Sequence, residues 1–205
     1  MGYMDFFKLF SLPRHLHLSL PELEKSFYAQ SRRYHPDRFA ARPAEEQADA
    51  LRRSSMLNDA YRTLREPIAR TEYLLSLEGV QMEEQSRAAT DAARAGGTEK
   101  KQVAPPDLLE EAFELNMQLE EMRSARGTGE KDEAIEAELL AAQARYTGML
   151  NDLQGQLEAL WSGWDCAEDA ADEPGKASSK TAMIALLNRR AYVRNLVRDV
   201  QAALE

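Results

Sequence analysis

The stretch RRYHPDRFAARP, residues 32–43, determines how the N-terminal part of this 205-residue chain is expected to fold. It lies between two segments whose apolar residues recur at helical spacing, and it contains Pro36 and Pro43. Proline ends a helix and pushes the preceding residue out of helical conformation. We therefore expect two helices joined by a turn that presents the side chains of His35 and Asp37 from a backbone held rigid by Pro36.

Helix signals continue on both sides of this turn. Asp5 can cap a first short helix, and Ser19, which is followed by a proline and an acidic residue, can cap the longer helix before the turn. After the turn, helical spacing continues to the proline at position 67, and the amphipathic segment IARTEYLLSL closes the unit at about Gly79. The N-terminal part is thus predicted to be a helical hairpin with short flanking helices.

The remainder of the chain is predicted to consist of a linker and a helical bundle. Few large apolar residues, one glycine pair at 96–97 and one proline pair at 105–106 mark residues 80–106 as a linker. No alternating pattern typical of strands is present, so we expect an all-α protein with domains at 1–79 and 107–205. The second domain is predicted to be an antiparallel three-helix bundle. Its helices are expected at about 107–126, 131–161 and 179–204, separated by Gly127–Gly129 and by the acidic segment 165–179.

The charge of the chain is distributed unevenly. The formal net charge is -9, yet the first 78 residues are close to neutral and the acidic excess lies in the second part. Within residues 25–42, five basic side chains face only one acidic one, Asp37. An acidic surface repels phosphate groups, so neither nucleic acid nor a membrane surface is an expected partner. No apolar run approaches the roughly 18 residues of a membrane span, and we expect a cytoplasmic protein.

The predicted helix at 107–126 carries more apolar residues than one buried face needs. Five of them fall within about 80° on a helical wheel and form a predicted buried seam: Leu108, Ala112, Leu115, Leu119 and Met122. Leu109, Phe113 and Met117 form a second stripe, bordered by glutamates. That stripe either packs against the third helix in a wider core or binds a partner, since an exposed apolar stripe edged by charge is typical of a protein interface.

The sequence around the turn resembles a J domain, the module by which co-chaperones stimulate ATP hydrolysis by DnaK-type chaperones. More narrowly, the chain resembles the HscB family, the J-protein co-chaperones of iron–sulfur cluster assembly. The resemblance rests on MDFFKLFSLP at 4–13, YHPDRFA at 34–40, LNDAYRTLREPIARTEYLL at 57–75 and the acidic helical pattern of the C-terminal part. It therefore spans most of the chain.

This resemblance implies two protein partners, a chaperone ATPase of the DnaK or HscA type and the iron–sulfur scaffold protein. The implied chaperone-binding residues are His35, Pro36, Asp37, Lys25, Arg32, Arg33 and Arg38. The implied scaffold-binding residues are Leu109, Glu110, Phe113, Glu114, Met117, Glu121 and Tyr192. Two of these positions depart from the family pattern. Glu110 is acidic where that pattern has an apolar residue, and Met117 is apolar where it has an acidic one.

Other functions are less well supported by the residues. Catalysis by His35 and Asp37 requires a nucleophile or a substrate pocket, and a metal site requires more ligands than the three histidines and the single cysteine, Cys166, supply. No phosphate-binding glycine motif is present, so we expect no enzyme, no cofactor and no metal. A J-domain co-chaperone for an unrelated client and a helical adaptor with an incidental HPD tripeptide remain as alternatives.

Overall fold

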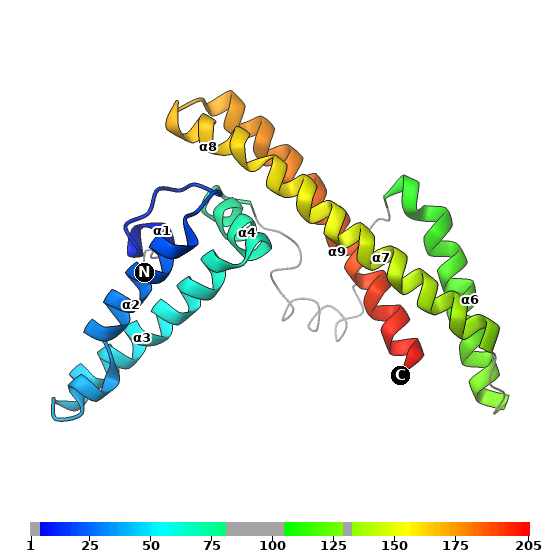
Figure 1. Cartoon of the computed structure of the whole chain (residues 1–205), viewed down its shortest axis with the longest axis horizontal. Coiled ribbons are helices and arrows are strands. Elements are labelled where there is room, and N and C mark those ends of the chain that lie inside the picture. Colours follow the sequence, from blue (N-terminus) through cyan, green and yellow to red (C-terminus); the bar gives the residue numbers. More distant parts are fainter. Residues whose placement is uncertain (1–4, 81–104, 129–132) are drawn as a thin grey trace. The chain divides into compact units, whose positions relative to one another are not determined.

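The computed structural model describes residues 5–80, 105–128 and 133–205. All regular structure within these ranges is α- or 3₁₀-helical, which confirms the predicted all-α class (Figure 1). None of the helices in the described ranges is long and apolar enough to cross a membrane.

The chain divides into two compact units, each of which is discontinuous in sequence. The first unit comprises Met1–Met82 and Leu160–Lys180, and the second comprises Glu83–Ala159 and Thr181–Glu205. The segment at 160–180 therefore groups with the N-terminal part, whereas a continuous C-terminal domain at 107–205 was predicted from the sequence. The predicted linker falls almost entirely outside the described residues, and its boundaries at 80 and 106 stay a prediction.

The N-terminal helices begin and end close to the predicted positions. The Asp5 carboxylate accepts hydrogen bonds from the first amides of α1, and the Ser19 hydroxyl accepts one from the amide of Glu22 at the start of α2. These bonds satisfy amide groups that have no partner within a helix. The elements are α1 (Phe6–Leu9), α2 (Leu20–Arg33), the 3₁₀ turn η1 (Pro36–Phe39), α3 (Ala44–Arg65) and α4 (Pro67–Leu77).

Helices α2 and α3 form an antiparallel hairpin, with η1 at the end where they are joined (Figure 1). Leu23 of α2 and Leu57 of α3 are fully buried. Phe27 of α2 stacks on Tyr61 of α3, with ring centroids 4.3 Å apart. This packing holds the two helices side by side, so the turn projects from a rigid support.

The segment 165–179, predicted to be a connector, is mostly helical. Helix α8 spans Trp161–Asp169, and α9 begins at Glu173 and continues to Leu204 in the second unit. Between them, Ala171 adopts a left-handed backbone with φ of 50°, and the Asp172 amide donates to the Ala167 carbonyl, 2.8 Å away. Alanine-rich sequence favours helix. Three buried side chains of α8, those of Trp161, Trp164 and Ala167, add packing that the acidic composition of the segment does not reveal.

Helix α8 binds the loop that connects α1 to α2. The Asp165 carboxylate accepts hydrogen bonds from the backbone amides of Leu16 and His17, at 2.7 and 3.0 Å, and contacts the His17 imidazole at 2.9 Å. One turn away, the His15 imidazole lies 2.8 Å from Asp169. The indole of Trp164 is fully buried and donates to the carbonyl of Arg14, 3.3 Å away. These contacts explain why α8 belongs to the first unit.

The second unit contains the predicted three-helix bundle. A short 3₁₀ turn, η2 (Pro106–Leu108), leads into α6 (Leu109–Thr128), which is followed by α7 (Glu133–Ala159) and the C-terminal part of α9. The three helices contribute one cluster of buried apolar residues, and the whole predicted seam of α6 is buried in it. Gly127 lies inside α6 rather than in a separating loop, so the predicted break at Gly127–Gly129 begins too early.

The contacts of α8 yield a stability prediction. Replacing Asp165 by alanine leaves two backbone amides without their acceptor, that of the buried Leu16 among them, and we expect a loss of about 2–4 kcal/mol in the free energy of unfolding. Asp169→Ala is the matched control, because its carboxylate is 69% exposed and, among the residues that the structure describes, contacts only the His15 side chain. That change should cost less than about 1 kcal/mol. Urea titrations followed by circular dichroism measure both, and equal losses would contradict the role assigned to Asp165.

Candidate functional site

The HPD turn consists of His35, Pro36 and Asp37, and it lies at the surface of the first unit. His35 precedes η1, and its Nδ1 accepts a hydrogen bond from the Asp37 amide at 3.3 Å. The same nitrogen lies 3.4 Å from the Asp37 carboxylate. The side chains are 56% and 88% exposed, respectively. Because Nδ1 is directed toward the turn itself, Nε2 is the ring nitrogen available to another molecule.

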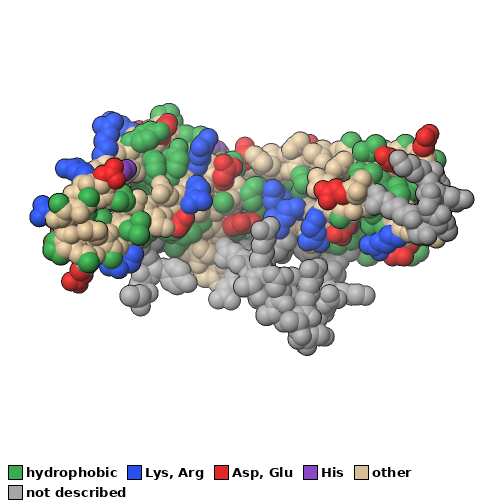
Figure 2. Space-filling model, turned by 90° about the horizontal axis from the view of Figure 1, so that it is seen from below, with side chains coloured by type: hydrophobic (Ala, Val, Ile, Leu, Met, Phe, Trp, Pro, Cys, Tyr) green, Lys and Arg blue, Asp and Glu red, His purple; other side chains and the backbone are tan. Residues whose placement is uncertain are grey.

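Basic side chains border this turn along α2. Lys25 and Arg32 are exposed and seven residues apart, which places them on one side of the helix, and Arg33 is exposed beside them. Lysine and arginine side chains gather over the α2–α3 end of the first unit in Figure 2. The exposed ring of Tyr28, three residues after Lys25, lies on the same side of the helix. Sequence reasoning missed Tyr28, although its helical spacing from Lys25 and Arg32 was available as a signal.

Arg38 differs from the other predicted basic residues because its guanidinium is bound within the unit. It donates to the backbone carbonyl of Arg32, 3.1 Å away, near the C-terminal end of α2. Carbonyl groups at a helix end have no partner within the helix, and a cation at that position also interacts favourably with the helix dipole. Arg38 therefore ties the turn to α2, whereas the head groups of Lys25 and Arg32 remain available.

A second candidate surface is the α6 stripe, defined as Leu109, Phe113 and Met117. These side chains are 54%, 67% and 59% exposed, whereas the seam on the other side of α6 is buried. The alternative that the stripe packs in a wider core is therefore wrong. Three exposed glutamates border the stripe, Glu110, Glu114 and Glu121. An apolar strip with an acidic edge fits a partner that carries apolar and basic groups.

Tyr192, the remaining predicted contact, has different surroundings from the stripe. It is only partly exposed and packs against the buried cluster of the second unit. Burial raises the pKa of its phenol, and the nearby Tyr146 adds to that effect. Its ring therefore helps to close the bundle core, and only part of it is open to a partner.

The start of α6 is held in place by an ion pair with α9. The Arg189 guanidinium contacts both carboxylate oxygens of Asp107, at 2.8 and 2.6 Å. This hydrogen bonding lowers the pKa of Asp107. Asp107 lies two residues before Leu109, so the ion pair fixes the end of α6 at which the exposed stripe begins.

The chain is similar to known co-chaperones along most of its length. No family model matches it. Two curated relatives from Vibrio cholerae serotype O1 strains, both named co-chaperone protein HscB homolog, are 33% identical over 166 residues, which is 81% of this chain and 86% of each relative. The solved structure of the chaperone HscB from Vibrio cholerae has 27% identity and a TM-score of 0.61, and the match covers 97% of this chain and 96% of that one.

A further likeness concerns the fold alone. The crystal structure of the human co-chaperone protein HscB matches with a TM-score of 0.60 and 20% identity, and the match covers 98% of this chain and 83% of the human one.

The contrast between seam and stripe predicts that two substitutions in α6 change the stability by very different amounts. Phe113→Ala removes a large side chain that is already exposed to solvent, so the free energy of unfolding should change by no more than about 0.5 kcal/mol. Leu115→Ala opens a cavity in the bundle and should cost about 2–5 kcal/mol. Chemical denaturation of the full chain measures both values. A large loss from Phe113→Ala would mean that the stripe is part of the core.

Proposed function

Since this chain belongs to the HscB family of co-chaperones, we propose that it brings the iron–sulfur scaffold protein to a DnaK- or HscA-type chaperone and stimulates that chaperone's ATP hydrolysis. The observation that carries the proposal is the pairing, on one chain, of an exposed HPD turn with an exposed apolar stripe. In this proposal the turn binds the chaperone and the stripe binds the scaffold protein.

We assign chaperone contact to the turn and to α2. His35 and Asp37 offer the partner a hydrogen-bonding imidazole and a carboxylate from a backbone that Pro36 holds rigid. Lys25, Arg32 and Arg33 supply positive charge that steers the first unit toward an acidic surface of the chaperone. Arg38 acts as a positioning residue through its bond to α2, and Tyr28 adds apolar area within the basic side of that helix.

We assign scaffold contact to α6. Its three stripe residues supply apolar area, and Glu110, Glu114 and Glu121 supply charge at the edge, which favours a scaffold surface with apolar and basic residues. Tyr192 belongs to this surface only through the exposed part of its ring. Within this assignment the Asp107–Arg189 ion pair positions the first stripe residue.

The proposed mechanism depends on both partners being bound to one chain. A scaffold protein held by α6 is present near the chaperone at a high effective concentration while the HPD turn promotes hydrolysis. In this role the chain binds and presents proteins and needs no catalytic group, cofactor or metal of its own. We further propose that it acts in the cytoplasm.

The first test of this function is at the turn. His35→Gln removes the imidazole that the chaperone is proposed to contact, a loss of about 1.5–3 kcal/mol for a charge-assisted bond, which lowers a rate by about tenfold or more. We therefore expect the variant to lose most of the stimulation in a steady-state ATP turnover assay with the cognate chaperone. His15→Gln, a histidine of the same unit bound to Asp169, should retain it. Unchanged stimulation by His35→Gln would exclude the turn as the trigger.

The second test is at the stripe. The double variant Leu109→Ala/Phe113→Ala should bind purified scaffold protein at least about 30-fold more weakly, the effect of losing about 2 kcal/mol at an interface. It should still stimulate ATP hydrolysis in the absence of scaffold, because the HPD turn is intact. Leu140→Ala is the control, since Leu140 is an exposed leucine on α7 outside the stripe. Full scaffold affinity in the double variant would instead favour an unrelated client.

A further inference from the structure

A hollow of about 570 Å3 lies beside the HPD turn, between the end of α2 and the first turns of α3. Its walls include the rings of Tyr34 and Phe39, the Pro43 ring and the methyl group of the buried Ala50. Phe39 is the last residue of η1, which begins at Pro36. A molecule that binds the turn therefore lies next to this α3 hollow as well.

One side of the hollow has its charges paired within the unit. Asp49 contacts Arg53 at 2.8 Å and Arg52 at 3.2 Å. Arg53 also donates to the Tyr34 hydroxyl at 3.3 Å and lies over the Tyr34 ring. Arg33 lies near the same ring, 5.4 Å from its centroid. Tyr34 and Asp49 thus already have cationic partners, and this side of the hollow requires no further ligand.

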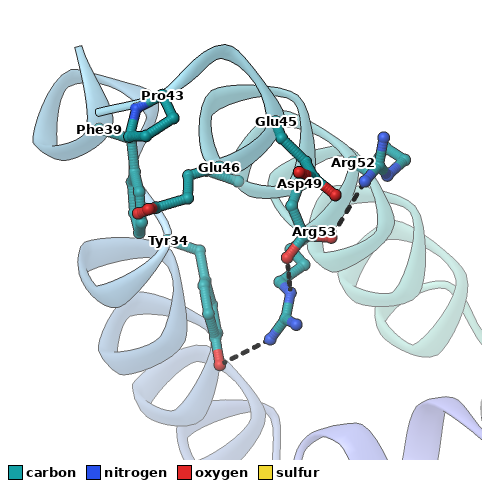
Figure 3. A pocket seen from close by; sticks show the side chains of 9 residues that line it. Tyr34, Phe39, Pro43, Glu45, Glu46, Asp49, Arg52 and Arg53 are labelled. Carbon is teal, nitrogen blue, oxygen red and sulfur yellow. Dashed lines mark hydrogen bonds and ion pairs between the residues drawn. The ribbon is translucent and has the colours of Figure 1, made fainter. Parts of the chain in front are cut away.

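The other side holds a carboxylate and an aromatic ring without such a partner. Glu45 and Glu46, in the first turn of α3, are exposed, and neither has an ion pair within the described part of the chain. Glu46 and Phe39 both line the hollow, and Figure 3 draws the Glu46 carboxylate on the side where Phe39 and Pro43 lie. A cation is attracted both to a carboxylate and to the electron-rich face of an aromatic ring, so a basic group in the hollow can interact with both residues.

We propose that the α3 hollow receives a lysine or arginine side chain of the DnaK-type chaperone, a contact that extends the docking surface from α2 across the HPD turn to α3. The inference rests on the proposed function. The aliphatic stem of the incoming residue lies along Phe39, Pro43 and Ala50, and its charged end pairs with Glu46. Glu45 adds negative charge at the same end of α3.

With this contact, the two sides of the docking surface carry opposite charges. The α2 side presents Lys25, Arg32 and Arg33, and the first turn of α3 presents Glu45 and Glu46. Arg52 and Arg53, further along α3, are both paired with Asp49. A matching chaperone surface carries acidic groups opposite α2 and a basic side chain opposite α3. Because the reversed orientation brings like charges together, the two sides favour one orientation of docking around the HPD turn.

The test measures the affinity of the ATP-bound cognate chaperone for full-length variants. Glu46→Lys places a positive charge in the hollow and should weaken binding about tenfold or more, the effect typical of a like-charge contact at an interface. Glu46→Gln should weaken it less. Phe39→Leu retains apolar volume but loses the ring face, so it should also reduce affinity. Glu66→Lys, at an exposed position beyond the far end of α3, makes the same change in net charge and should leave affinity unchanged.

The outcomes separate this proposal from the proposed function. Melting temperatures within a few degrees of the wild-type value establish that the variants are folded. If Glu46→Lys is not folded, the affinity of Glu46→Gln is measured in its place. If the wild-type chain stimulates ATP hydrolysis and Glu46→Lys binds as tightly as Glu66→Lys, the hollow is not a docking site and the proposal is overturned. Equal weakening by both lysine variants indicates a general charge effect and also overturns it. A wild-type chain that neither binds nor stimulates the chaperone refutes the proposed function itself.

Discussion

The attachment of helix α8 to the loop before α2 is the interaction on which the first unit depends. Asp165 accepts hydrogen bonds from two consecutive backbone amides of that loop, and the buried Trp164 donates to a carbonyl of the same loop. These bonds hold the loop against α8, whereas the Ser19 cap sets where α2 begins. The hairpin packing of α2 on α3 then places the HPD turn. Residues outside the proposed docking surfaces thereby help to position the residues within them.

Much of the fold follows from local sequence signals. Pro36 ends α2, Asp5 and Ser19 cap helices, and the spacing of Leu108, Ala112 and Leu115 marks the buried side of α6, because each of these effects acts within a few residues. The stripe was also visible in the spacing, but only the exposure of its own side chains in the folded bundle distinguishes an exposed stripe from a wider core.

Three features were beyond prediction from the sequence, for different reasons. Asp165 lies about 150 residues from its amide partners, so no local pattern links them. Because the contacts of α8 are that distant in sequence, its acidic, alanine-rich sequence was interpreted as a connector. At the HPD turn, charge alone does not distinguish Arg38, which is bound to the end of α2, from Lys25 and Arg32. That distinction requires geometry. The α3 hollow likewise exists only because the turn brings Phe39 beside the first turn of α3.

The discontinuity of the first unit has a consequence for synthesis on the ribosome. The hairpin of α2 and α3 is local in sequence and is able to form early, but the loop that precedes α2 meets its partners only after residues 161–169 have left the exit tunnel. Until then Leu16, which is fully buried in the finished protein, lacks the Asp165 acceptor for its amide. Contacts so distant in sequence slow folding. The N-terminal part of the chain is therefore made first but reaches its final structure only after most of the C-terminal part has been translated.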